Sequence, residues 1–189
     1  MITYKKGVHM KKLMIAGIVG FGLVLSGCSN IEKETEERVR NSLKDPQSAQ
    51  FQNVKGYCGE VNAKNSYGGY TGFKQFYVSN GVPVFFDEDA DNPLSFTLGW
   101  KGYCEIESKL SDENIAACVS FANFGRAVVG SKLAGVPISK SKGSIKASTK
   151  EDQAIYFKVI DNGYKVNNEA SFATSILQDC LSGEIKVPN

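Results

Sequence analysis

Every fourth position from residue 31 to residue 43 is apolar or, at Thr35, weakly polar, and most positions between them are charged or polar. This period predicts a helix with one buried face. We expect Pro46 to stop the helix, because a proline disfavours helical backbone in the residue before it. The predicted buried face carries Ile31, Thr35, Val39 and Leu43.

Residues 51–108 follow a different pattern, in which short aromatic and β-branched runs are separated by clusters of Gly, Asn, Asp and Pro. Such runs are typical of strands and predict a small antiparallel sheet of about four or five strands. We expect Cys58 to lie in the first strand and Cys104 in the last. The runs, in order, are FQNVKGYCGEVNA, FKQFYV, VPVFF, SFTLGW and KGYCEI.

The last third of the chain has the apolar period of helices. Ser111 is expected to begin one helix, whose apolar positions include Cys118. Asn168 is expected to begin another, whose inward face includes Cys180. We expect Gly183 to end this second helix, because glycine readily adopts left-handed backbone.

The chain from residue 114 to residue 150 is basic. Residues 114–150 contain six Lys and Arg and no acidic residue, a charge that suits anionic lipid, lipopolysaccharide or peptidoglycan carboxylates. Residues 139–148 are rich in Ser, Lys and Gly, and a solvated, flexible linker is the favoured interpretation. Ser148 and Glu151 have the spacing of a capping box, which predicts a helix through AIYFKVI.

Together these patterns predict an α+β protein. We expect an N-terminal helix within residues 28–46, a β-rich domain over residues 47–108 and a helical, disulfide-linked domain over residues 109–189.

Residues 10–28 read MKKLMIAGIVGFGLVLSGC, with a charged start, an apolar run and a small-residue end. The apolar run is shorter than the roughly 20 residues that span a membrane, so residues 1–27 are predicted to end in a cleaved export signal. The last four positions, LSGC, resemble a bacterial lipobox, which implies cleavage before Cys28 and lipid on its thiol. The alternative is a soluble exported protein in which Cys28 is incidental.

Residues 1–9 fit no part of such a signal, and codons for residues 6–9 could contain a ribosome-binding sequence. We therefore expect translation to begin at Met10. The DNA upstream of Met10 tests this hypothesis, because codons without an AGGAG-like run would contradict it.

Cleavage before Cys28 changes the composition. The full chain has 22 Lys and Arg, 20 Asp and Glu and one histidine. Residues 1–27 contain four of the lysines, no acid and the histidine, His9, so 18 basic and 20 acidic residues remain. The processed chain can therefore have no Ser-His-Asp or Cys-His pair and no His-bound zinc, whereas acid–base chemistry by Asp, Glu, Lys or Tyr stays open.

Four cysteines remain besides Cys28, and an even number in an exported chain predicts two disulfides. Their spacing is too wide for a CxxC redox or zinc motif. Of the three available pairings we favour Cys58 with Cys104 and Cys118 with Cys180, because each pair then closes within one structural segment.

Residues 57–73 combine glycines with aromatic and polar residues. Gly68, Gly69 and Gly72 favour a tight turn between two strands, and aromatic faces on this turn could bind a sugar, a peptide or a protein. The alternative is a plain hairpin whose aromatic residues cover the sheet and whose Asn and Glu side chains satisfy turn amides. The candidate partner-binding residues are Lys64, Asn65, Tyr67, Tyr70 and Phe73.

This segment and the residues before it carry the pattern LKDPxSAxF followed by CGxVNxKNxxGGYxGxxxF. Over residues 43–78 the chain resembles small lipoproteins and exported proteins of proteobacteria, their prophages and their plasmids. The resemblance implies an envelope location and no particular activity. The mobile-element setting of the relatives suggests a narrower hypothesis, a role in phage or plasmid exclusion.

The acidic run at residues 87–92 is predicted to be a solvated turn. Read as a calcium loop that starts at Asp87, it has Asn92 where a Gly is required and Leu98 where a bidentate Glu is required. We expect no catalytic residue, no metal site, no cofactor and no nucleic-acid partner.

These expectations describe a non-catalytic envelope lipoprotein that binds a protein or cell-wall partner and is held at a membrane by lipid on Cys28. Ser29 is not Asp, which by the sorting rule of enteric bacteria predicts the outer membrane, facing the periplasm; an inner-membrane anchor is the alternative. The competing hypothesis is a periplasmic enzyme or enzyme inhibitor that acts on the cell wall and uses Glu60 or the acidic residues at 87–91.

Overall fold

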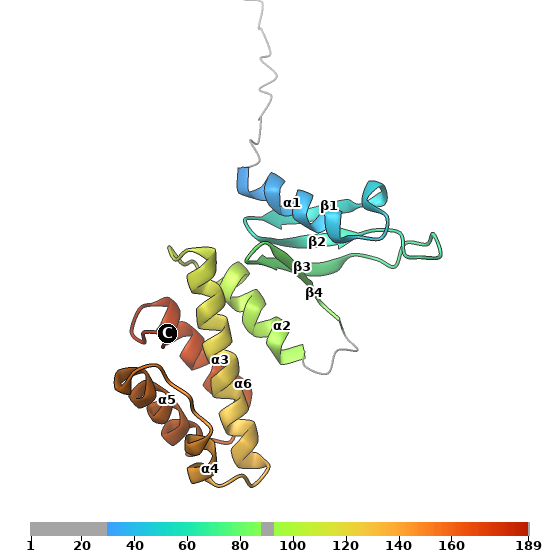
Figure 1. Ribbon diagram of the computed structural model, residues 1–189. Helices are drawn as coiled ribbons and strands as arrows, with labels where there is room; N and C mark the ends of the chain where they lie inside the picture. The colour runs from blue at the N-terminus through green and yellow to red at the C-terminus, as the bar shows by residue number, and fades with distance from the viewer. Residues whose placement is uncertain (1–29, 88–92, 189) are drawn as a thin grey trace, which may run out of the picture.

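The computed structural model describes residues 30–87 and 93–188 and has the predicted α+β class, with a sheet at one end of the molecule and most of the helices at the other (Figure 1). The predicted signal peptide and Cys28 lie outside the described residues. The elements are α1 (Asn30–Ser42), the 3-10 helix η1 (Pro46–Ser48), β1 (Gln50–Lys55), β2 (Cys58–Asn62), β3 (Lys74–Ser79), β4 (Val82–Phe85), α2 (Pro93–Trp100), the π-helix η2 (Lys101–Glu105), α3 (Asp112–Leu133), α4 (Ile138–Gly143), α5 (Lys150–Gly163) and α6 (Glu169–Leu181).

Helix α1 forms where the four-residue period predicted it and lies across one face of the sheet (Figure 1). Val39 is fully buried in a core that it shares with Val61, Phe76 and Val78. The first position of the predicted stripe is different, because Ile31 is 45% exposed.

The sheet is antiparallel and its strands lie in chain order, β1-β2-β3-β4. The run that we expected to be one first strand is instead a hairpin of β1 and β2. Gly56 stands at the turn with φ +57°, a backbone conformation that glycine adopts without strain, so the chain reverses there. As a result Cys58 begins the second strand and not the first.

The last two predicted strands, SFTLGW and KGYCEI, are helical and form α2 and η2. Their aromatic and apolar residues gave a strand pattern, but tertiary packing outweighs such propensities. Leu98 is fully buried in the core of the helices, and Tyr103 and Ile106 pack against that same core. Cys104 therefore lies in a helical turn rather than in a strand.

Helices α3 and α6 run antiparallel and share the main apolar core. Three predicted boundaries are confirmed, because the side chains of Ser111 and Asn168 accept hydrogen bonds from the first turns of α3 and α6, and Gly183 follows α6 with φ +84°. Local capping chemistry is thus sufficient to place these helix ends.

The capping box predicted at Ser148 is wrong by one residue. Thr149 is the N-cap of α5, and its hydroxyl oxygen accepts a hydrogen bond of 3.0 Å from the backbone N–H of Asp152. The Thr149 hydroxyl also donates to the Asp152 carboxylate, at 2.8 Å. The adjacent segment, predicted to be a flexible linker, contains the short helix α4.

Both predicted disulfides are present. Cys58 is bonded to Cys104, which joins β2 to η2, and Cys118 is bonded to Cys180, which joins α3 to α6. The first bond does not close a purely β unit as expected, since it connects the sheet to the helical part of the molecule.

Aromatic packing supports the same junction. Side chains alternate across a strand, so Phe76 of β3 faces α1, whereas Tyr77 faces α2 and η2 on the other side of the sheet. The ring of Tyr77 stacks on that of Tyr103, with ring centres 5.4 Å apart and planes 14° from parallel. Gly99 of α2 leaves room for this ring, because a Cβ at that position would lie 2.1 Å from the Tyr77 hydroxyl oxygen.

Within the described ranges, no helix is long and apolar enough to cross a membrane.

We predict that Gly99→Ala lowers the free energy of unfolding by about 1–3 kcal/mol, the usual cost of overpacking a filled site. Urea denaturation measures the change. Gly143→Ala is the matched control, because a Cβ there meets nothing within 4 Å. Equal stability of the two variants would contradict the close fit between α2 and β3.

Candidate functional site

The predicted binding residues lie in the loop of residues 63–73, which joins β2 to β3 and extends beyond the end of the sheet (Figure 1). We call this segment the hairpin loop. It lies at the end of the sheet that is remote from the helices α3 to α6. Every residue from 65 to 73 is exposed.

Asn65 organises the tip of the hairpin loop. Its side-chain oxygen accepts hydrogen bonds from the backbone N–H groups of Tyr67, at 2.9 Å, and of Gly69, at 3.2 Å. The Asn65 N–H donates to the Gly69 carbonyl, and its carbonyl accepts from the N–H of Gly68. Gly68 has φ +80°, which only glycine adopts without strain. The tip is therefore held by its own hydrogen bonds.

Ser48, which ends η1, supports the base of the hairpin loop. Its hydroxyl oxygen accepts a 2.9 Å hydrogen bond from the Lys64 N–H, and its carbonyl accepts a 3.2 Å hydrogen bond from the Tyr70 hydroxyl. Lys64 and Tyr70 also pair across the loop as an isolated antiparallel bridge, and the Lys64 Nζ lies 5.8 Å from the centre of the Tyr70 ring. These contacts fix the direction in which the loop leaves the sheet.

The three aromatic side chains of the hairpin loop remain in solvent. Tyr67 is 96% exposed, and Tyr70 and Phe73 are 46% and 43% exposed. The alternative in which these rings cover the sheet is thus wrong for Tyr67. Large aromatic side chains usually bury much of their surface, so an exposed ring on an ordered loop is a candidate contact for a partner.

The predicted residues divide into two groups. Tyr67, Tyr70 and Phe73 present aromatic surface, whereas Asn65 uses its side-chain oxygen within the loop, as the alternative interpretation predicted. Lys64 lies over the ring of Tyr70, so it supports the loop as well as contributing charge. Sequence reasoning missed Ser48, because nothing in the pattern shows that this residue meets a loop 16 positions later.

Glu60 lies in β2, and of the acidic run only Asp87 is among the described residues. The Glu60 carboxylate accepts hydrogen bonds from Gln52 Nε2, at 2.6 Å, and from Asn53 Nδ2, at 3.0 Å, next to a bulge in β1. Residues 88–92 lie outside the described part of the chain. Within the described part, no three His, Cys, Asp or Glu residues gather as ligands for a metal.

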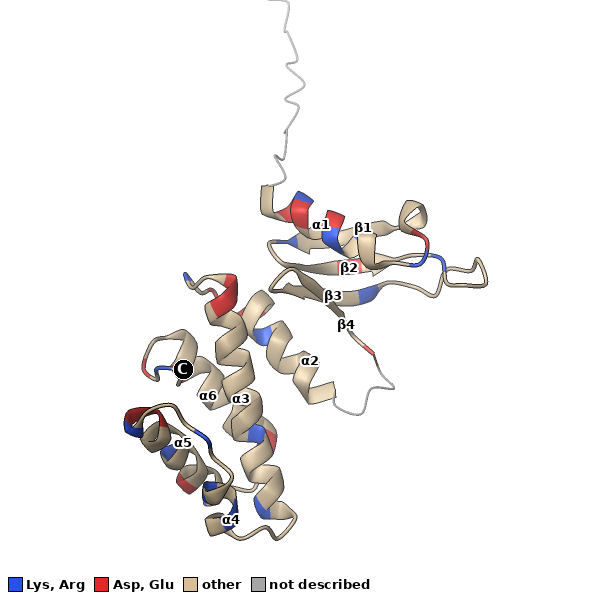
Figure 2. Ribbon diagram, in the orientation of Figure 1, with Lys and Arg blue, Asp and Glu red and all other residues tan. Residues whose placement is uncertain are grey.

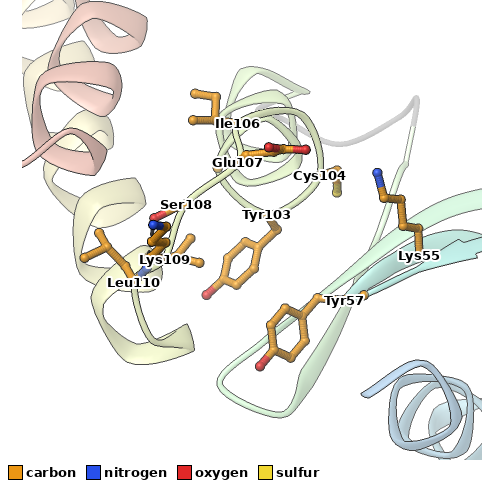
Figure 3. A pocket seen from close by; sticks show the side chains of 12 residues that line it. Lys55, Tyr57, Tyr103, Cys104, Ile106, Glu107, Ser108, Lys109 and Leu110 are labelled. Atoms are coloured by element: carbon orange, nitrogen blue, oxygen red, sulfur yellow. Dashed lines mark hydrogen bonds between the residues drawn. The ribbon is translucent and has the colours of Figure 1, made fainter. Parts of the chain in front are cut away.

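A second feature, which the sequence did not predict, is a groove of about 570 Å³ between the β1–β2 turn and the chain that leads from η2 to α3 (Figure 3). Tyr57 and Tyr103 form its aromatic wall, with the rings nearly perpendicular and their centres 6.0 Å apart. Lys55 and Glu107 also line the groove. The groove could not be foreseen because η2 was expected to be a strand.

The aromatic wall of the groove is tied to the fold. The Tyr103 hydroxyl donates to the Asp112 carboxylate, at 2.7 Å, and lies 2.9 Å from the Ser79 hydroxyl. Burial raises the pKa of Tyr103 and, likewise, that of Tyr77, so both phenols are neutral at physiological pH. The groove thus offers shape and apolar surface, while its Tyr103 hydroxyl is engaged in holding the helices to the sheet.

No known protein family, no curated protein and no solved structure matches this chain.

We predict that Asn65→Ala loosens the hairpin loop, because the N–H groups of Tyr67 and Gly69 lose their acceptor. Hydrogen exchange at these two amides should become at least several-fold faster, and the free energy of unfolding should fall by about 0.5–1.5 kcal/mol. Asn65→Asp keeps an acceptor oxygen and serves as the control. Unchanged exchange at Gly69 in the alanine variant would show that the side chain does not order the loop.

Proposed function

We propose that this chain is a non-catalytic envelope lipoprotein, anchored through Cys28, that binds a protein or cell-wall partner with the hairpin loop. The observation that carries the proposal is the almost complete exposure of Tyr67 on a loop whose backbone is held by Asn65 and Ser48. The lipobox-like end of the signal segment supports the anchor.

Preorganisation is the physical basis of the binding proposal. A loop that is already ordered loses little conformational entropy when a partner binds, so more of the contact energy appears as affinity. Tyrosine suits this role because it offers a large apolar ring, a polar hydroxyl and few rotatable bonds. A loop that projects from the sheet suits a concave site on a partner.

That shape also favours the enzyme-inhibitor version of the competing hypothesis. An ordered, projecting loop with an aromatic residue at its tip can occupy the cleft of a cell-wall enzyme without any chemistry of its own. The version in which this chain is itself an enzyme would depend on Glu60, whose carboxylate is engaged by Gln52 and Asn53, or on the acidic residues at 87–91. Inhibition is therefore the form of the alternative that the loop geometry favours.

We predict that Cys28→Ala abolishes incorporation of labelled fatty acid and leaves the signal peptide uncleaved, because the lipid-accepting thiol is gone. Metabolic labelling and the mass of the purified chain measure both effects. Ser29→Ala is the matched control and should keep the lipid. Ser29→Asp should move the lipidated chain from the outer-membrane to the inner-membrane fraction. Labelling that persists in the alanine variant at Cys28 would refute the anchor.

We predict that Tyr67→Ala weakens partner binding at least tenfold, the size expected for an aromatic hot spot. Crosslinking in the intact envelope, followed by mass spectrometry, identifies the partner and measures its capture. The free energy of unfolding should change by no more than about 0.5 kcal/mol, since the side chain is 96% exposed.

Val82→Ala is the control for this experiment, because Val82 is an exposed apolar residue on β4, outside the hairpin loop. It should leave capture unchanged. Full capture by a folded chain carrying both Tyr67→Ala and Tyr70→Ala would exclude the hairpin loop as the binding site. If this chain is instead an enzyme that uses Glu60, Glu60→Gln should abolish its turnover, whereas Tyr67→Ala should leave turnover unchanged.

A further inference from the structure

The end of the helical part opposite the sheet forms a second exposed surface. It consists of residues 132–142, from the end of α3 through α4, and residues 164–167, which follow α5; we call it the distal tip (Figure 1). The helix α1 begins at the other end of the molecule. The distal tip is thus separate from the hairpin loop and from the N-terminal end of the described chain.

The distal tip is ordered by polar contacts between its two segments. The Tyr164 hydroxyl donates a 2.8 Å hydrogen bond to the Val136 carbonyl and lies 2.7 Å from the Ser141 hydroxyl. The Lys132 ammonium donates a 2.8 Å hydrogen bond to the Val166 carbonyl and a second one to the side-chain oxygen of Asn167. The residues around this corner therefore keep fixed positions relative to one another.

Positive charge gathers on the distal tip (Figure 2). Lys142 is paired with the Asp161 carboxylate, at 2.7 Å. Among the described residues, no carboxylate forms an ion pair with Lys132, Lys140 or Lys165. The hydrogen bonds of Lys132 go to neutral oxygens, so its charge also remains uncompensated.

Apolar side chains are exposed among these lysines. Leu133 is 55% exposed and Ile138 is 36% exposed. Both lie in the part of the chain, residues 114–150, that contains no acidic residue. Exposed aliphatic residues surrounded by lysines are typical of surfaces that lie in the interface of an anionic membrane, where the apolar groups enter the boundary of the acyl chains and the ammonium groups meet phosphates.

We propose that the distal tip docks on the surface of an anionic phospholipid membrane. Leu133 and Ile138 enter the interface, and Lys132, Lys140 and Lys165 contact the headgroup phosphates. Because the exposed charges of the distal tip are positive, they match an anionic partner. The two exposed aliphatic side chains favour lipid over a purely polar polymer such as peptidoglycan. This inference is independent of the hairpin loop and of the proposed anchor at Cys28.

The test uses tryptophan fluorescence in the full chain carrying Leu133→Trp, which keeps an apolar group at the tip. Vesicles of phosphatidylcholine containing about one-third phosphatidylglycerol should shift its emission to shorter wavelength relative to the parent chain, because the indole leaves water. Vesicles of phosphatidylcholine alone should produce at least a fivefold smaller shift. Added salt should weaken the response, since it screens the lysines.

Variants assign the response to the distal tip. Adding Lys140→Glu and Lys165→Glu should abolish the shift, whereas Lys44→Glu and Lys55→Glu, with the same change in net charge on the sheet side, should preserve it. A tryptophan placed by Val82→Trp should not respond. The native Trp100, at the end of α2, emits in every variant, so the spectrum of the parent chain is subtracted from each one. The difference reports on the introduced tryptophan whether or not the chain is lipidated.

Four results would overturn the proposal. The first is no shift with anionic vesicles, and the second is an equal shift with neutral vesicles. The third is a shift produced by purified peptidoglycan and not by vesicles. Loss of the response in the Lys44 and Lys55 control variant would likewise show that net charge, and not the distal tip, drives the binding.

Discussion

The stack of Tyr103 on Tyr77 is the contact that joins the two halves of this protein. The Tyr103 ring packs against the sheet, its hydroxyl is bonded to Asp112 at the start of α3, and the next residue, Cys104, is linked to β2. One short helical turn thus holds the sheet through aromatic packing, a hydrogen bond and a covalent bond. Gly99 completes the fit, because a larger residue would occupy the space of the Tyr77 ring.

This junction lies between two exposed surfaces at opposite ends of the molecule. The hairpin loop extends from one end of the sheet, and the distal tip closes the far end of the helices (Figure 1). Both surfaces are ordered mainly by hydrogen bonds of Asn, Ser, Lys and Tyr side chains to the backbone rather than by an apolar core. Their aromatic or aliphatic side chains can therefore stay in solvent while the backbone keeps one conformation.

Much of the candidate site was accessible from sequence because its chemistry is local. Glycines and an asparagine within five residues indicate a tight turn, and Asn65 closes that turn through amides two and four residues away. The support from Ser48 was not accessible, because it joins residues from separate elements. The groove beside Tyr103 was missed for a related reason, since it exists only where η2 meets the β1–β2 turn.

The sequence by itself determined the α+β class, the first helix and the caps at Ser111 and Asn168. Each depends on residues close in the chain. The cysteine pairing was favoured among three, and the structure has that pairing although Cys58–Cys104 joins the sheet to a helical turn. Only the tertiary structure decided that residues 93–105 are helical, since their aromatic composition suits a strand equally well. Burying Leu98 and Tyr103 against α3 outweighs that local preference, because packing energy depends on neighbours that a sequence pattern does not show.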